Sequence, residues 1–270
     1  MHLRTLLKAD NMNILDAIVE HKRVEILKRK QKRPLSSLSA FPHYRRKTNE
    51  IDQTLLTQKP GIIAEFKRKS PSKGAINLEA DPVEVAGGYA RSGVAAMSIL
   101  TDRNFFGGSF ADMRQVREAH PGLTLLRKDF IIDPYQLHEA SAYGADLVLL
   151  IAAILSKNQV AELAEEAGSL GLQILFEVHD RNDLECYHDS IRYVGVNNRD
   201  LKTFRVDTGR SLSLLGDMPD GVIPVSESGF HTTKDIRSLW DAGYRLFLIG
   251  EAFMREKDPG KACELFLEHL

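Results

Sequence analysis

The sequence predicts an α/β fold, a (β/α)₈ barrel with an additional N-terminal helical segment, and two observations support this prediction. From Gly61 onward, eight short apolar runs alternate with helical patterns, and successive runs start 20 to 33 residues apart. Four helical patterns end in a glycine that leads into the next run, at Gly93, Gly144, Gly171 and Gly243. Apolar strands that alternate with helices form parallel sheets, and eight such units close into a barrel.

The segment before Gly61 does not follow this pattern. Residues 13–32 predict one amphipathic helix with an apolar face that includes Val24 and Leu27, and residues 35–58 predict a loop with a short helix. The other members of that face are Ile14, Leu15 and Ile18. We expect this helix to cap the barrel mouth and the following FPHYRR segment to lie close to it. Removing residues 1–45 should then weaken substrate binding more than it weakens the fold.

The remaining elements follow in order. The predicted strands comprise residues 62–66, 95–100, 123–126, 145–152, 173–178, 193–196, 222–225 and 245–249. Helix starts are marked by a capping side chain or by an early proline at Asp133-Pro134, Ser156, Thr232 and Asp258-Pro259. An open doubly wound sheet would favour a glycine fingerprint after the first strand, which the sequence lacks. We therefore expect one barrel domain, with residues 1–60 as its extension and residues 61–270 as eight βα units.

Composition excludes several classes of protein. The 270 residues are 43% hydrophobic and 27% charged, which is typical of a globular protein and argues against disorder or a fibrous repeat. The net charge of −1 gives no reason to expect nucleic acid or an anionic membrane as a partner. A basic run at residues 21–33 lacks the aromatic residues of a nucleic-acid platform, so we interpret it as the solvated face of a helix.

Cellular location and assembly follow from the same composition. Two cysteines, Cys186 and Cys263, cannot form a disulfide framework, and no apolar run is long enough for a membrane span. The first residues lack a secretory signal pattern. We expect a cytoplasmic monomer that requires no metal and no cofactor, while association with other enzymes is left open.

Charged residues occur where predicted strands end, which is where barrels carry their chemistry. Glu65 and Lys67 are two residues apart, so both face the barrel interior, and they form either an ion pair or part of a site. Lys128 follows the third run and suits a general acid. Glu177 ends the fifth run, where a carboxylate suits acid or base work.

Later strand ends supply groups that can bind anions. Asn197 and Arg199 follow the sixth run, and the arginine fork fits a planar carboxylate. Gly229 and Gly250 follow the seventh and eighth runs, where glycine lets backbone N–H groups approach a phosphate. Each glycine could instead be a turn residue, but two in these positions favour a phosphorylated ligand.

The strand-end segments resemble those of the indole-3-glycerol phosphate synthase family of tryptophan biosynthesis. The resemblance rests on AEFKRKSPSKG, LRKDFIID, ADLVLLI, FEVH, GVNNRDL, VSESG and LIGEAFM. It extends to the ILDAIVEHKRVEI helix and to FFGGSF, and so covers nearly all of the chain. It implies conversion of 1-(2-carboxyphenylamino)-1-deoxyribulose 5-phosphate to indole-3-glycerol phosphate, with loss of carbon dioxide and water.

The resemblance also implies a role for each matching residue. Lys128 corresponds to the general acid, Glu177 to the general base of dehydration, and Glu65 to its assistant. Lys67 would hold the substrate carboxylate or act as a second acid, with Arg199 at the carboxylate end. Asn197 and Ser228 would orient the ribulose hydroxyls and Glu65. Phosphate would be held by Ser70, Gly229, Gly250 and the backbone of Glu251, and the aromatic ring would lie against Phe130 and Leu149.

One departure and two alternatives accompany this resemblance. Many relatives have serine where this chain has Glu251, and a carboxylate would repel phosphate, so we expect its side chain to turn outward. A phosphoribosylanthranilate isomerase-like barrel would need an aspartate and a cysteine, yet Cys186 falls in a helix-like stretch. A non-catalytic protein that binds a phosphorylated ligand or a nucleic acid would not need Lys128 and Glu177 at facing strand ends.

Overall fold

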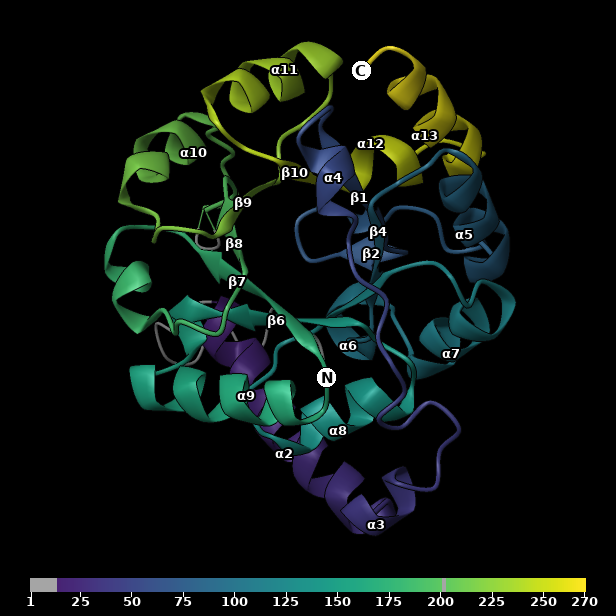
Figure 1. The fold of residues 1–270 in the computed structure, drawn as a ribbon. Coiled ribbons are helices and arrows are strands. Elements are labelled where there is room, and N and C mark those ends of the chain that lie inside the picture. The colour runs from purple at the N-terminus through teal and green to yellow at the C-terminus, as the bar shows by residue number, and fades with distance from the viewer. Residues whose placement is uncertain (1–13, 201–202) are drawn as a thin grey trace.

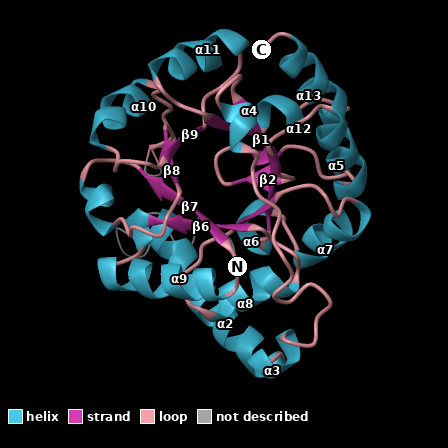
Figure 2. Cartoon of the chain, in the orientation of Figure 1, coloured by secondary structure: helices cyan, strands magenta, loops and turns pink. Residues whose placement is uncertain are grey.

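Eight parallel strands close into a barrel in the computed structural model, which describes residues 14–200 and 203–270 (Figures 1 and 2). The strands are β1 (Gly61–Phe66), β4 (Ala96–Leu100), β5 (Leu125–Lys128), β6 (Leu147–Ile151), β7 (Gln173–Val178), β8 (Tyr193–Asn197), β9 (Ile223–Glu227) and β10 (Leu246–Ile249). Each strand pairs with its neighbours in chain order, and β1 closes the ring by pairing with β10. The predicted barrel is confirmed, and the strand boundaries differ from the predicted ones by at most two residues.

Helices surround the barrel on its outside (Figure 2). They are α5 (Pro82–Arg91), α6 (Arg103–Phe106), α7 (Phe110–Ala119), α8 (Tyr135–Ala142), α9 (Lys157–Ser169), α10 (Gly209–Leu214), α11 (Thr233–Ala242), α12 (Glu251–Met254) and α13 (Pro259–Glu268). The predicted caps Ser156, Thr232 and Asp258 each accept a backbone N–H at a helix start. At Asp133-Pro134 the helix begins one residue later, and Asp133 accepts the N–H of Tyr135 at 2.9 Å. No helix in the described ranges is long and apolar enough to cross a membrane.

Side chains alternate along each strand between the barrel interior and the helices, as the strand period requires. On β1, Ala64 and Phe66 pack in the layer between strands and helices, whereas Ile63 belongs to the cluster inside the barrel. The interior cluster also contains Ala96, Leu126, Leu147, Leu149, Leu175, Tyr193, Val225, Leu246 and Leu248. This alternation directs Glu65, two residues beyond Ile63, into the mouth of the barrel.

The N-terminal helix α2 (Ile14–Lys32) forms where the sequence predicts it, but its second half docks through a different face. Val24 and Leu27, predicted to pack, are 50% and 62% exposed, while Ile26 and the charged Lys22 are buried. Lys22 can be buried because Asp102 and Asp129 each lie within 3 Å of its ammonium group, at 2.8 and 2.9 Å. The predicted apolar face is therefore wrong for the second half of the helix.

The segment after α2 does not lie at the mouth, contrary to prediction. The ring of Phe41 packs on Tyr143 with 5.2 Å between centroids, and the hydroxyl of Tyr44 is 2.7 Å from Nδ1 of His138 on α8. The chain passes through α3 (Leu35–Leu38) to α4 (Gln53–Leu56), which lies next to β1 (Figure 1). The FPHYRR segment thus serves to fasten the chain to the outside of the barrel.

Residues of the N-terminal segment contribute to the interior cluster from two different elements. Ile18 of α2 joins this cluster, and so do Ile51 and Leu56 from the region of α4. Leu56 lies close to Gly61, where β1 begins, whereas Ile18 lines the cavity at the other ends of the strands. The extension therefore covers both ends of the barrel.

Candidate active site

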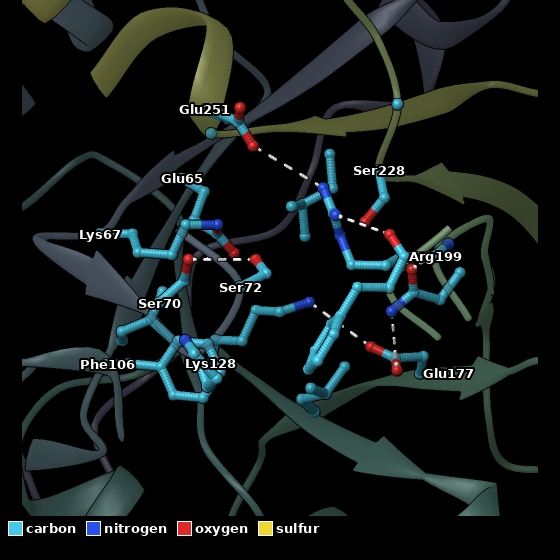
Figure 3. A pocket seen from close by; sticks show the side chains of 18 of the residues that line it. Glu65, Lys67, Ser70, Ser72, Phe106, Lys128, Glu177, Arg199, Ser228 and Glu251 are labelled. Carbon is cyan, nitrogen blue, oxygen red and sulfur yellow. Dashed lines mark hydrogen bonds and ion pairs between the residues drawn. The ribbon is translucent and has the colours of Figure 1, made fainter. Parts of the chain in front are cut away.

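A cavity opens at the carboxyl ends of the barrel strands, and every site residue that the sequence predicts lies on its wall (Figure 3). These residues are Glu65, Lys67, Ser70, Lys128, Phe130, Leu149, Glu177, Asn197, Arg199, Ser228, Gly229, Gly250 and Glu251. They come from seven of the eight strands or from the loops that follow them. The barrel thus brings together groups that are up to 186 positions apart in the sequence, from Glu65 to Glu251.

Lys128 stands between two carboxylates at the base of this cavity. Its ammonium nitrogen is 3.5 Å from Oε2 of Glu177 (Figure 3). The same nitrogen is 2.7 Å from Oε2 of Glu227. Burial alone would lower the pKa of Lys128, but these two carboxylates raise it well above the ordinary value for lysine. The residue therefore holds its proton at neutral pH, as a general acid must before it reacts.

Glu227 is a site residue that the sequence reasoning did not identify. Its side chain is 1% exposed, and its Oε1 atom has no hydrogen-bond partner among the described residues. Burial raises the pKa of Glu227 to about 7, although Lys128 acts in the opposite direction. A Cβ atom at Gly195 would lie 2.4 Å from this carboxylate, so glycine on the neighbouring strand makes room for it. Its position two residues after Val225 could have identified it by the same argument that selected Glu65.

Glu65 and Lys67 form the ion pair that their spacing allows. The Lys67 ammonium lies 2.5 Å from Oε1 of Glu65. Burial alone would raise the pKa of Glu65, but the Lys67 and Lys128 ammonium groups hold it below its ordinary value. A Cβ atom at position 250 would lie 2.6 Å from Oε1 of Glu65, so Gly250 provides space for this carboxylate. Glycine is therefore needed at position 250 to make room for Glu65, in addition to its predicted place beside phosphate.

Glu177 is held by neighbours on two elements. Asn197, on the adjacent strand β8, donates its side-chain N–H to Oε1 of Glu177 at 3.1 Å. Nε2 of His179 lies 3.5 Å from the same oxygen, and the ring faces Asp183 on its other side. Burial alone would lower the pKa of His179, but Asp183 and Glu177 raise it. These contacts fix one carboxylate oxygen and turn the other toward Lys128.

Small residues that follow β9 shape another part of the cavity wall. Ser228 has a left-handed backbone with φ of 70°, and Gly229 follows with φ of 94°. Asn198 holds this turn by donating to the Ser228 carbonyl at 3.2 Å. A side chain at Gly229 would meet Val206 at 2.4 Å, so only glycine fits there without strain. Across the cavity, the Ser70 hydroxyl accepts the backbone N–H of Lys73 at 3.2 Å.

An apolar wall completes the cavity. Phe130 and Leu149, both predicted, are joined by Phe106, whose ring centroid is 5.9 Å from that of Phe130. Leu15 and Ile18 of α2 add aliphatic surface. The last three were not identified from the sequence as site residues, because neither α6 nor α2 belongs to a predicted strand end. The wall suits a planar aromatic group.

Glu251 does not turn outward, contrary to prediction. Its Oε2 lies 3.7 Å from the guanidinium of Arg199 (Figure 3). Its Oε1 lies 3.2 Å from the ammonium of Lys73. The expectation was wrong because it considered only repulsion by a bound phosphate. The cations Lys73 and Arg199 attract the carboxylate and draw it into the mouth.

Two remaining expectations concern metals and cysteine. Within the described ranges, no group of three or more histidine, cysteine, aspartate or glutamate side chains is arranged to hold a metal ion. Cys186 ends the short 3₁₀ helix η2 (Asn182–Cys186), as its helix-like surroundings predict, and it is not one of the residues that line the cavity. Cys186 is therefore not one of the acid–base groups of the cavity.

Comparison with known proteins identifies relatives over nearly the whole chain. Residues 15–266 match the family model described as indole-3-glycerol phosphate synthase. An indole-3-glycerol phosphate synthase of Bacteroides thetaiotaomicron is 43% identical over 256 residues, which cover 95% of this chain and 98% of that protein. One from Salinibacter ruber is 44% identical, with coverage of 93% and 94%.

Solved structures show similarity of fold at low sequence identity. 3-Hexulose-6-phosphate synthase from Salmonella typhimurium has a TM-score of 0.62 and 12% identity, covering 78% of this chain and 98% of that one. Tryptophan synthase subunit alpha from Legionella pneumophila has a TM-score of 0.58 and 14% identity, with coverage of 82% and 97%. At such identities the likeness concerns the fold alone.

Proposed function

Since the chain belongs to the indole-3-glycerol phosphate synthase family, we propose how its own residues carry out that reaction in tryptophan biosynthesis. The reaction closes the indole ring of 1-(2-carboxyphenylamino)-1-deoxyribulose 5-phosphate and releases carbon dioxide and water. One observation carries the proposal. Lys128 and Glu177 project into a single cavity, 3.5 Å apart, beside an apolar wall that includes Phe130 and Leu149.

Substrate binding uses the two chemically different sides of the cavity. The aromatic ring lies against Phe130 and Leu149, where its burial is favourable. Its carboxylate is attracted by Lys67, with Arg199 in support. The phosphate approaches Ser70 and the backbone around Gly229, and Gly250 with the Glu251 backbone completes this end. The substrate is thereby stretched across the mouth with its ketone toward Lys128.

Ring closure is the step assigned to Lys128. The ring carbon that bears the carboxylate attacks the ketone carbon, and the ammonium donates a proton to the ketone oxygen as the new bond forms. Loss of carbon dioxide then returns the bonding electrons to the ring and restores aromaticity. Glu227 supports this step by keeping the ammonium group in place, 2.7 Å away.

Dehydration is the step assigned to Glu177. Its carboxylate removes the proton whose loss creates the indole double bond, while a lysine protonates the departing hydroxyl. Either Lys67, or Lys128 once it has regained a proton, can serve as that second acid, since both border the cavity. Asn197 orients Glu177 through its 3.1 Å hydrogen bond, and Glu65 assists from β1. Ser228 is placed to contact the ribulose hydroxyls.

Indole formation on mixing the protein with the anilino-ribulose phosphate tests this function directly, because it changes both absorbance and fluorescence. The assay is run with and without EDTA, and with Lys128→Met as the comparison. We expect product from the unaltered protein in both buffers and none from the variant. Failure of the unaltered protein to form indole would overturn the proposal, and loss of product only in EDTA would overturn a metal-free mechanism.

A further inference from the structure

Three charged side chains form a bridge over the edge of the cavity. Glu251 begins α12, Arg199 follows β8, and Lys73 lies in the turn between the short strands β2 (Lys69–Ser70) and β3 (Gly74–Ala75). The Glu251 carboxylate is the central member, at 3.2 Å from Lys73 and 3.7 Å from Arg199. Its side chain is 26% exposed, so the bridge is only partly in water.

This bridge lies at the end of the cavity proposed to receive phosphate. The backbone N–H of Lys73 contacts the Ser70 hydroxyl at 3.2 Å, and Gly250 immediately precedes Glu251. Ser70 and Gly250 are two of the groups assigned above to phosphate, so the inference rests on that assignment. An incoming phosphate would meet Lys73 and also Arg199, because the Arg199 guanidinium, assigned above to the carboxylate end, reaches Glu251 at this end of the cavity. The Glu251 carboxylate already pairs with both cations.

Repulsion between the phosphate and the Glu251 carboxylate determines how the two anions compete for these cations. A phosphate monoester carries nearly two negative charges at neutral pH, and it cannot share the two cations with Glu251 without repulsion at short distance. Ion pairs of partly exposed side chains are individually weak, so a ligand with the larger charge can displace the carboxylate. The displacement still subtracts from the affinity, because the pairs present in the empty site are lost.

We propose that Glu251 is an internal anion that occupies Lys73 and Arg199 in the empty site and weakens the binding of phosphate. It gives up both cations when the phosphorylated end of a ligand enters, and takes them back when the ligand leaves. Because substrate and product carry the same phosphate, the effect applies to both. Glu251 therefore limits how long product is retained as well as how tightly substrate binds.

Titration calorimetry with inorganic phosphate tests this inference on the full chain without turnover. In Glu251→Gln the shape of the side chain is kept and the charge is lost, so we expect phosphate to bind about tenfold more tightly. Glu256→Gln is the matched control: it removes the same charge five residues away, where Glu256 is exposed and pairs only weakly with Arg255 at 3.2 Å. We expect the control to change the dissociation constant by less than about twofold.

The Lys73→Gln variant shows whether Glu251 weakens phosphate binding by competing for the Lys73 cation or only by repelling the phosphate. If Glu251 acts by occupying Lys73, then Glu251→Gln should improve phosphate binding less in the Lys73→Gln background than in the native one. Equal improvement in both backgrounds would overturn the occupied-cation account. Melting temperatures of all variants are recorded, and Glu251→Asp, which keeps the charge, provides a second comparison if the Gln variant unfolds.

The outcome separates this inference from the proposed function. Phosphate affinity that is unchanged or lower in Glu251→Gln would overturn the role of Glu251 and leave the catalytic proposal intact. Phosphate that fails to bind to any variant of a protein active in the indole assay would overturn both the phosphate assignment and the inference drawn from it. An inactive wild-type protein whose phosphate affinity still rises about tenfold in Glu251→Gln would overturn only the catalytic proposal.

Discussion

The ammonium of Lys22 lies 2.9 Å from the carboxylate of Asp129, the residue next to the proposed acid Lys128. Both side chains are fully buried. Burial alone would raise the pKa of Asp129, but Lys22 and Arg127 hold it far below its ordinary value. A charge on the N-terminal helix thus fixes the backbone at the end of β5, where Lys128 leaves the strand.

Replacing Lys22 with methionine should destabilise the protein severely. Asp102 and Asp129 would then remain buried without the cation that both contact, and breaking such a pair costs about 3–5 kcal/mol. Urea denaturation measures the loss. Lys28→Met, an exposed lysine on the same helix, is the control and should change stability by less than about 0.5 kcal/mol. Similar stability of the two variants would show that the buried pair contributes little.

Lys128→Met should abolish turnover and change substrate affinity by less than about tenfold, because the acid acts mainly in the transition state. The measurement is single-turnover indole formation together with equilibrium binding. A variant that keeps more than a tenth of the wild-type rate, which corresponds to a barrier change under about 1.4 kcal/mol, would remove Lys128 as the essential acid.

Glu177→Gln should stall the reaction after ring closure. The carboxamide keeps the size of the side chain and can still contact Asn197, but it cannot accept a proton at neutral pH. Carbon dioxide release and indole formation are followed separately in a single turnover. We expect carbon dioxide to be released without a matching amount of indole. An equal fall in both would place Glu177 in the earlier step as well.

Ionisation of Glu227 should appear in the pH dependence of stability. Its folded pKa of about 7 lies above the ordinary 4.5, so the folded state binds this proton more tightly than the unfolded chain does. The resulting stabilisation is complete below pH 4.5 and is lost as the pH rises to about 7.

Comparison with Glu227→Gln isolates this effect, because the amide does not titrate. Unfolding free energies from urea titrations are compared between pH 4.5 and 7. Relative to the wild type, the variant should gain up to about 3 kcal/mol over this window. A difference between the two proteins that stays constant with pH would show that Glu227 does not titrate there.

The site residues at the strand ends could be predicted from the sequence, because the carboxyl ends of all strands in a barrel meet at one mouth. Glu65, Lys128 and Glu177 were found in this way, and all three line the cavity. The same rule reaches Glu227, but only if β9 is extended two residues beyond its apolar part. The Glu227 carboxylate can be buried there because Gly195, on the adjacent strand, has no side chain and leaves room for it. The residue pattern of one strand alone does not reveal such a space.

The N-terminal segment was harder to predict because its docking depends on contacts far apart in sequence. Val24 and Leu27 fit an apolar face, yet the partners of Lys22 lie 80 and 107 residues away at Asp102 and Asp129. Once paired, a buried lysine can replace an apolar anchor. Residues 14–45 therefore contribute to the fold as well as to the site. Removal of residues 1–45, predicted to affect mainly binding, should also destabilise the barrel.

Two substitutions on α2 should separate its contributions to the site and to the fold. Leu15 lines the cavity and is half-buried, whereas Ile26 is 3% exposed and packs in the layer between strands and helices. Leu15→Ala removes apolar surface beside the substrate ring and should raise KM about fivefold, with little change in melting temperature. Ile26→Ala leaves a cavity in the core and should cost about 2–4 kcal/mol of unfolding free energy.

KM and the free energy of unfolding are measured for both variants, Leu15→Ala and Ile26→Ala, so that each variant serves as the control for the other. If α2 serves both the site and the fold, each variant changes one quantity and spares the other. A helix that acts only as a structural plug would leave KM unchanged in Leu15→Ala, despite the position of Leu15 on the cavity wall. A helix that acts only at the mouth would leave the stability of Ile26→Ala unchanged, which the buried position of Ile26 against the barrel argues against.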